Sequence, residues 1–162
     1  HSVPGAFMTM LSLTFINEII RITTDYTPAN ILEQLRIRIK DIFKKASSYD
    51  QNGLDIAFCT VDIQTNILQY AGAYNPLWII RDSKLLEYKG TRAPIGNYPK
   101  HIGFKNTAIQ LKNDDLIYLF SDGYYDQFGY ENDVKFGKKA FRKLLLTIQH
   151  LQLKKQFLMQ KL

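Results

Sequence analysis

The sequence predicts an α+β layered domain in which helices flank a run of antiparallel strands. Apolar residues recur at helical spacing before residue 46 and again after residue 138. Between residues 54 and 120 the apolar residues instead alternate with polar ones, as they do in strands. An order of helices, then strands, then helices favours an α+β domain over the alternating strand–helix units of a nucleotide-binding fold.

Two amphipathic helices are predicted at the start of the chain. Val3, Pro4 and Gly5 read as a loop leading into the first helix. The second helix begins at Pro28, with Thr27 as its candidate N-cap, and ends near Ala46. The expected buried faces are Phe7, Met8, Leu11, Phe15, Ile19 and Ile22 in the first helix, and Ile31, Leu32, Leu35, Ile39, Ile42 and Phe43 in the second.

Three strand pairs are predicted after a polar loop at 47–53. The first joins 54–61 to 67–73 through a turn at 62–66, and the second joins 77–81 to 85–88 through Asp82 and Ser83. A loop at 89–103 leads to the third pair, 104–111 with 116–120. A final helix begins near Lys138, with Phe141, Leu144, Leu145 and Ile148 as its apolar positions.

The composition is that of one ordinary globular domain, with 46% hydrophobic and 22% charged residues among 162. The single cysteine, Cys59, excludes an internal disulfide, suits a reducing cytoplasm and is expected in the core. With only three histidines besides, any metal would have to be held by carboxylates. The apolar stretch 6–22 is interrupted by polar residues, so we expect neither a membrane span nor a signal peptide.

The net charge of +6 is concentrated near the end of the sequence. Residues 134–162 carry eight Lys or Arg and no Asp or Glu. Such a segment is either a basic surface for nucleic acid or membrane, or a solvated helix face. No aromatic–basic interleaving supports nucleic-acid binding, so we expect no nucleic-acid partner. Because polar residues interrupt the apolar stretch 6–22, we also expect no direct membrane insertion.

The strongest local signal for chemistry is the run 116–120, five apolar residues that lead into Ser121, Asp122 and Gly123. It predicts a carboxylate at the end of a buried strand, on a turn whose glycine lets a ligand approach the backbone. A rigid strand end suits a metal-ligating aspartate. A plain strand-ending Asp-Gly turn is the alternative.

Five blocks of the chain carry a family resemblance. The residues from His1 to Met8 resemble the G-H-[GS]-V-P-G-A-F-M signature of the SpoIIE-like branch of the PPM (protein phosphatase 2C-like) family. Residues 53–57 resemble the second block of the family, 71–76 its Ala-Gly…Asn-Pro hairpin, and 94–96 its Pro-Ile-Gly loop. Residues 119–129, around Asp122, resemble its aspartate block.

The resemblance implies a fold and an activity. The implied fold is an α-β-β-α four-layer sandwich with two mostly antiparallel sheets. The implied activity is hydrolysis of phosphoserine or phosphothreonine by a water activated by two Mn²⁺ or Mg²⁺ ions. Hard oxygen ligands suit both ions, and paired metals roughly 3.5–4 Å apart can lower the pKa of water and neutralise phosphoryl charge.

Site residues follow from the same resemblance. Asp122 matches a metal-ligating, catalytic aspartate, and Gly123 the glycine that keeps its turn tight. His1 matches the histidine after the first metal-binding motif, where it supports the site and does not ligate. Asn75 and Gly96 could approach the phosphopeptide, although Asn75 reads equally as a turn residue. Asp126 either hydrogen-bonds within the aspartate block or is a solvated turn residue.

The family's other metal ligands would lie before residue 1 and after residue 162. We therefore expect residues 1–162 to be a single phosphatase domain truncated at both ends. The chain is then either an enzyme or a catalytically silent phosphatase-like binding module. The expected substrate is a phosphorylated regulatory protein of the anti-sigma-factor antagonist type, in the cytoplasm of a bacterium, with a parent protein that carries sensory or membrane parts.

Overall fold

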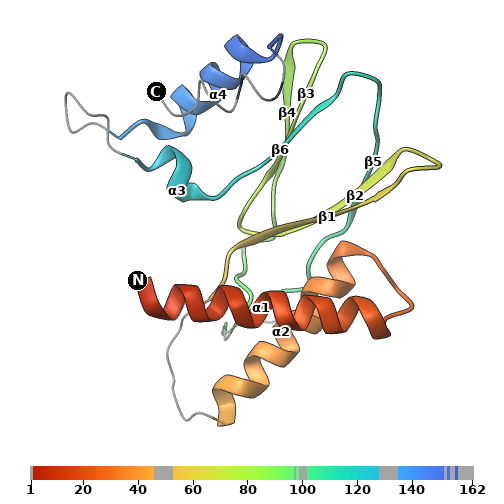
Figure 1. Cartoon of the computed structure of the whole chain (residues 1–162), viewed down its shortest axis with the longest axis vertical. Coiled ribbons are helices and arrows are strands. Elements are labelled where there is room, and N and C mark those ends of the chain that lie inside the picture. The colour runs from red at the N-terminus through yellow and green to blue at the C-terminus, as the bar shows by residue number, and fades with distance from the viewer. Residues whose placement is uncertain are drawn as a thin grey trace. The chain divides into compact units, whose positions relative to one another are not determined.

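The computed structural model describes residues 2–45, 53–96, 98, 102–127, 135–151, 153 and 156, with backbone only at 2–4 and 43–45. The chain forms two compact units. Unit 1 comprises His1–Pro76 and Lys89–Leu111, and unit 2 comprises Leu77–Tyr88 and Lys112–Leu162. Each unit combines helices with an antiparallel three-stranded sheet, which confirms the predicted α+β class (Figure 1).

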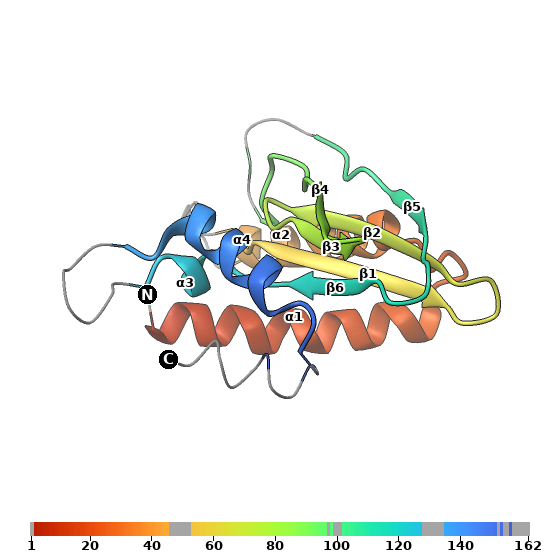
Figure 2. The same ribbon diagram turned by 90° about the horizontal axis from the view of Figure 1, so that it is seen from above.

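Unit 1 contains α1 (Ser2–Ile22), α2 (Pro28–Lys45) and a sheet in the order β1-β2-β5. The strands are β1 (Ile56–Asp62), β2 (Ile67–Ala73) and β5 (Thr107–Gln110). Helix α2 packs on β1 and β2, and α1 packs against α2. Figure 2 shows β1 and β2 as a long hairpin with β5 beside β2.

The core of unit 1 forms where the apolar face of α2 meets the sheet. Ile31, Leu32, Leu35 and Ile39 of α2 are fully or almost fully buried, as predicted. Each buried aliphatic side chain of this size stabilises the fold by about 1.5–3 kcal/mol relative to exposure. Arg36 is buried in the same helix, where it donates a 2.7 Å hydrogen bond to the backbone oxygen of Ile102.

Helix α1 differs from its prediction in start and orientation. It begins at Ser2, so the expected loop at Val3–Gly5 is wrong, since a proline is tolerated in a first helical turn. Its buried face is Met8, Ser12, Ile16 and Ile19, whereas the predicted core residues Phe7 and Ile22 are 58% and 67% exposed. Met8 and Ile19 are buried as predicted, which confirms the helical period, but the buried face is rotated toward Ser12 and Ile16.

Residues 5–22 of α1 are long and apolar enough, by length and composition alone, to cross a membrane. One such helix near the N-terminus is weak evidence, because core helices and signal sequences pass the same test. Ile19 of this helix is fully buried in the core of unit 1. The expectation that this segment does not insert into a membrane stays a prediction.

Unit 2 contains β3 (Leu77–Arg81), β4 (Lys84–Tyr88), β6 (Leu116–Leu119), α3 (Asp122–Tyr125) and α4 (Gly137–Ile148). The sheet order is β4-β3-β6. The core is formed by Trp78 and Ile80 of β3 with Phe141, Leu145 and Ile148 of α4. Phe141, Leu145 and Ile148 were expected on the apolar face of that helix, and the structure confirms them.

The predicted pairing of 104–111 with 116–120 is wrong. β5 pairs with β2 and β6 pairs with β3, so the two strands belong to different sheets. The turn 112–115 connects β5 of one sheet to β6 of the other, and Asp114 in this turn has a φ of 66°. A short turn permits a hairpin but does not require one, and Leu116 and Tyr118 of β6 instead pack against the core of unit 2.

Cys59 lies half-buried in β1. Burial raises the pKa of its thiol to about 11. This leaves little thiolate at neutral pH, which supports the predicted structural role over that of a nucleophile.

Candidate active site

Three of the sequence blocks that resemble the phosphatase family are held together in unit 1. Leu54 and Ile95 exchange two backbone hydrogen bonds of 2.8 and 2.9 Å. Ala73 forms a parallel bridge with Thr91, whose amide donates a 2.7 Å hydrogen bond to the oxygen of Gly72. Segments 53–57, 71–76 and 94–96 therefore form one backbone framework, although they are far apart in sequence.

Asn75 follows β2 and is half-buried. Its backbone oxygen accepts a 2.7 Å hydrogen bond from the hydroxyl of Tyr70. Glycine at position 72 permits this contact, because a Cβ there would lie 2.3 Å from that hydroxyl and 2.4 Å from the oxygen of Asn75. The hydrogen bond from Tyr70, and the close approach that Gly72 permits, thus fix the backbone of Asn75. The predicted proximity of Asn75 to substrate stays a prediction.

Gly96 is buried at the end of the Pro94–Ile95–Gly96 block and has a φ of 151°. Residues with a Cβ rarely adopt this conformation, so the backbone here favours glycine. The fixed turn places Ile95, which is fully buried, in the core of unit 1. Its approach to a phosphopeptide also stays a prediction.

Asp122 lies in unit 2, where β6 is followed by Phe120, Ser121 and the short helix α3. Ser121 is the N-cap, in an extended conformation. The segment rests on an aromatic cluster, in which the ring of Phe120 lies 4.6 Å from that of Trp78 and 5.0 Å from that of Phe141. The Asp122 side chain is exposed, and in the part of the chain that the structure describes no hydrogen bond or ion pair engages its carboxylate.

Two local expectations about Asp122 are corrected by the structure. The strand before it is not buried on both faces, since Ile117 and Leu119 are 40% and 50% exposed. The Asp-Gly pair forms the first turn of α3 and is not a tight turn, and a Cβ on Gly123 would meet only the Ser121 hydroxyl at an ordinary 3.6 Å. Ser121 occupies the N-cap position without a side-chain capping hydrogen bond, and the helix start is instead held by backbone bonds such as the 2.9 Å bond from the Asp126 amide to the oxygen of Asp122.

The remaining predicted site residues are placed as follows. Asp126 is the C-cap of α3 and pairs with Lys135, whose Nζ lies 3.5 Å from its carboxylate. This ion pair lies on the surface, where such pairs contribute little to stability. His1 lies outside the described residues.

The described residues do not by themselves fit a two-metal centre. Among them, no group of three or more His, Cys, Asp or Glu side chains could hold a metal ion. A two-metal site needs several carboxylates arranged around the ions. Asp122 has the chemistry of one ligand, and further ligands would have to come from elsewhere.

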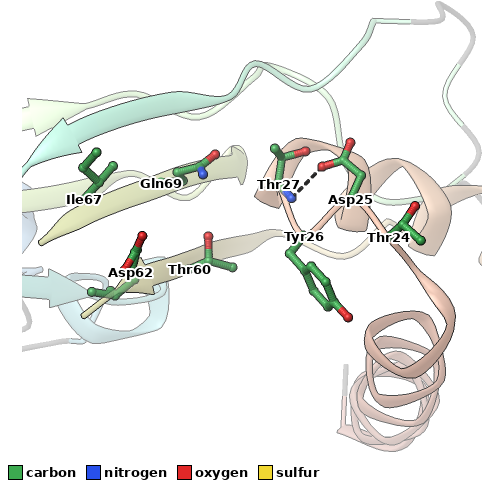
Figure 3. Close-up of a pocket in the computed structure, with 9 residues that line it drawn as sticks. Thr24, Asp25, Tyr26, Thr27, Thr60, Asp62, Ile67 and Gln69 are labelled. Atoms are coloured by element: carbon green, nitrogen blue, oxygen red, sulfur yellow. Dashed lines mark hydrogen bonds between the residues drawn. The ribbon is translucent and has the colours of Figure 1, made fainter. Parts of the chain in front are cut away.

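A separate pocket of about 310 Å³ lies in unit 1 between the α1–α2 turn and the β1–β2 hairpin (Figure 3). Its two carboxylates already accept backbone hydrogen bonds, Asp25 from Thr27 and Asp62 from Gln64. These bonds hold the pKa of both carboxyls below the usual range. The side-chain amide of Asn106 donates a 2.7 Å hydrogen bond to the side-chain oxygen of Gln69. Because these polar groups already have partners within the protein, we assign the pocket no chemical role.

The comparisons with known proteins agree with the sequence blocks. A family model described as Stage II sporulation protein E (SpoIIE) matches residues 1–162. The chain belongs to the SpoIIE family. A comparison with curated protein sequences gives no match.

Solved structures of PP2C-type phosphatase domains share the fold of this chain. The SiaA-PP2C domain of Pseudomonas aeruginosa is 28% identical with a TM-score of 0.86, over 99% of this chain and 62% of that chain. The phosphatase domain of SpoIIE from Bacillus subtilis, in a crystal form without domain swapping, is 17% identical with a TM-score of 0.50, over 99% and 66% of the two chains. The chain thus has a PP2C-type phosphatase fold and spans less than two thirds of the SiaA domain.

Proposed function

We propose that this chain is part of a metal-dependent protein phosphatase that hydrolyses phosphoserine or phosphothreonine in a regulatory protein. The products are inorganic phosphate and the free hydroxyl of the side chain. The observation that carries the proposal is the carboxylate of Asp122, which is exposed and held in place by the aromatic cluster beneath α3. Membership of the SpoIIE family, and likeness to a PP2C domain at 28% identity, support it.

In this proposal Asp122 contributes one ligand to a site for Mn²⁺ or Mg²⁺, because carboxylate oxygens are the ligands that both ions prefer. The substrate would be a phosphorylated regulator of the anti-sigma-factor antagonist type in the cytoplasm. The parent protein would carry the sensory or membrane parts that control it.

A second candidate function is a catalytically silent phosphatase-like module that binds a partner. The observation that favours it is that the described residues gather no set of metal ligands. Both functions are compatible with the fold, because function depends on the site and not on the fold.

One experiment separates the two functions. A segment of the parent protein as long as the full SiaA-PP2C domain is incubated with p-nitrophenyl phosphate and with a phosphoserine peptide, in Mn²⁺ and in EDTA. Release of phosphate in Mn²⁺ that stops in EDTA supports the phosphatase. No release in either condition, from a protein that melts cooperatively, contradicts it and leaves the silent module.

A further inference from the structure

Tyr74 stands out among the residues with unusual backbone conformations. Its φ is 57°, and the other described non-glycine residues with positive φ are the small polar residues Asn66, Asp82, Ser83 and Asp114. Short polar side chains tolerate this region, but a bulky aromatic residue there is a true outlier. The amide of Asn75 donates a 2.6 Å hydrogen bond to the oxygen of Ala73, which closes a γ-turn around Tyr74. The positive-φ form of this turn is rare and strained.

The strained turn does not serve to bury the ring. Tyr74 is 44% exposed, although a buried aromatic side chain would have offset the cost of its backbone. Strain that packing does not explain is found preferentially at functional sites. The turn therefore displays Tyr74 on the surface of unit 1.

A cation and a second phenol lie beside Tyr74. The amide of Tyr74 donates a 2.9 Å hydrogen bond to the oxygen of Thr91, which fixes the neighbouring Arg92 next to the turn. Arg92 is exposed, and no ion pair to it is found within the described ranges of the chain. Tyr98 lies close enough to Tyr74 for the two phenols to interact, and Arg92 and Asp55 lie near enough for their charges to act on Tyr74.

We propose that Arg92, with the hydroxyls of Tyr74 and Tyr98 beside it, binds an anionic group of the phosphoprotein substrate. The proposal rests on the phosphatase function proposed above and names its substrate-recognition surface. A guanidinium offers paired donors that match a carboxylate or a phosphate, and the phenol pair can add an O–H donor beside it. The surface is part of the backbone framework that the 53–57, 71–76 and 94–96 blocks form.

The anion has two possible sources, the phosphate that is removed or an acidic side chain near it in the substrate. Asp55 places a negative charge close to Tyr74, so the surface does not attract anions through net charge alone. Loss of the Arg92 side chain is therefore a sharper test than a change of salt concentration.

The test measures binding of two fluorescent phosphoserine peptides, one with Asp and Glu flanks and one with neutral flanks, by anisotropy. The proteins are the phosphatase segment used above, which is as long as the SiaA-PP2C domain, and its Arg92→Ala, Arg92→Lys and Arg21→Ala variants. Arg21 is an exposed arginine on α1 and serves as the matched control. Loss of a charged hydrogen bond predicts about 10-fold weaker binding or more for Arg92→Ala, and partial recovery for Arg92→Lys.

A loss confined to the acidic peptide identifies a flanking carboxylate as the bound group. An equal loss for both peptides, with weaker competition by inorganic phosphate, identifies the phosphate. Unchanged binding, or an equal loss in Arg21→Ala, overturns the proposal. Turnover of p-nitrophenyl phosphate by the wild-type protein is measured in parallel, so failure of the phosphatase function is seen separately from failure of this surface.

Discussion

Gly72 shows, at the scale of one residue, how the framework around the candidate site limits side-chain size. A methyl group on this residue would lie 2.4 Å from the backbone oxygen of Asn75, and a backbone atom cannot simply rotate away. The glycine is also followed, two residues later, by the strained turn at Tyr74. Any shift at residue 72 would therefore reach both Asn75 and Tyr74.

We expect Gly72→Ala to destabilise the protein by about 1–3 kcal/mol, the usual cost of overpacking. Gly5→Ala is the matched control, because a Cβ on Gly5 has no atom within 4 Å and alanine favours the helix by about 1 kcal/mol. Urea unfolding of both variants measures the difference. Equal stability of Gly72→Ala and the wild type would show that the segment adjusts without cost.

Asp122→Asn should abolish turnover of the phosphatase segment while leaving its fold intact. The change keeps the shape of the side chain but removes a charge that would help to hold a divalent ion. Mutation of a residue that only hydrogen-bonds to a metal ligand typically costs about 10–100-fold in metal affinity or activity. Loss of a ligand itself should therefore reduce the activity by at least that factor. The assays are a rate in Mn²⁺ and a thermal melt in EDTA.

Asp41→Asn provides the control for that measurement, since Asp41 is an exposed aspartate on α2. A near-wild-type rate for a folded Asp122→Asn variant would show that Asp122 is not a metal ligand. A variant that fails to fold would assign the residue a structural role.

At the scale of elements, an ion pair joins β3 to the turn before β6. The Arg81 guanidinium donates hydrogen bonds of 2.8 and 2.6 Å to the two carboxylate oxygens of Asp115. The Asp115 side chain is only 3% exposed. The hydrogen bond from Arg81 holds the pKa of this carboxyl below its usual range, so its charged form is favoured in the folded protein.

We expect Asp115→Asn to destabilise unit 2 by roughly 1.5–3 kcal/mol at pH 7, the typical value of a hydrogen bond to a charged group. Because the folded pKa lies below the unfolded one, the wild-type pair stabilises the protein above pH ~4 and loses this effect as the pH falls through the folded pKa. The difference between variant and wild type should therefore shrink in acid. Thermal melts between pH 7 and pH 2.5 test this.

Asp114→Asn is the matched control for the pH series. Asp114 is exposed beside Asp115, and asparagine tolerates its positive φ of 66°. A stability difference for Asp115→Asn that does not change with pH would contradict the role given to the ion pair.

At the scale of the whole molecule, the set of metal ligands decides whether the chain acts as an enzyme. The chain spans 62% of the SiaA-PP2C domain, and its described residues present no cluster of metal ligands. One aspartate cannot hold two ions. We therefore expect the 162-residue chain alone to hydrolyse p-nitrophenyl phosphate at a negligible rate in Mn²⁺, and a segment as long as the SiaA domain to be active.

Both proteins are assayed with and without EDTA, after circular dichroism has shown that each is folded. Equal, metal-dependent activity of the two would overturn the argument, because the short chain would then contain a complete site. An inactive long segment would favour the silent binding module.

The sequence by itself determined the elements and the family. The short, largely apolar runs at 67–73 and 77–81, each bounded by turn residues, and the helical spacing after Lys138 were enough to predict β2, β3 and α4, because these patterns depend only on local burial. The five blocks from His1 onward were enough to predict the SpoIIE-like branch, which the match over residues 1–162 confirms. The roles of Asp122, Asn75 and Gly96 stay predictions.

Only the tertiary structure decided how these elements combine. The strand β5 pairs with β2 and not with its neighbour β6, since backbone donors can be satisfied by any strand and the choice depends on packing of distant side chains. Tertiary packing also decided which face of α1 is buried: Ser12 is buried and Phe7 is exposed, in contrast to the prediction. It also holds Tyr74 at a positive φ, a conformation that propensity assigns to Gly or Asn and that only the contacts of Ala73, Asn75 and Thr91 impose on a tyrosine.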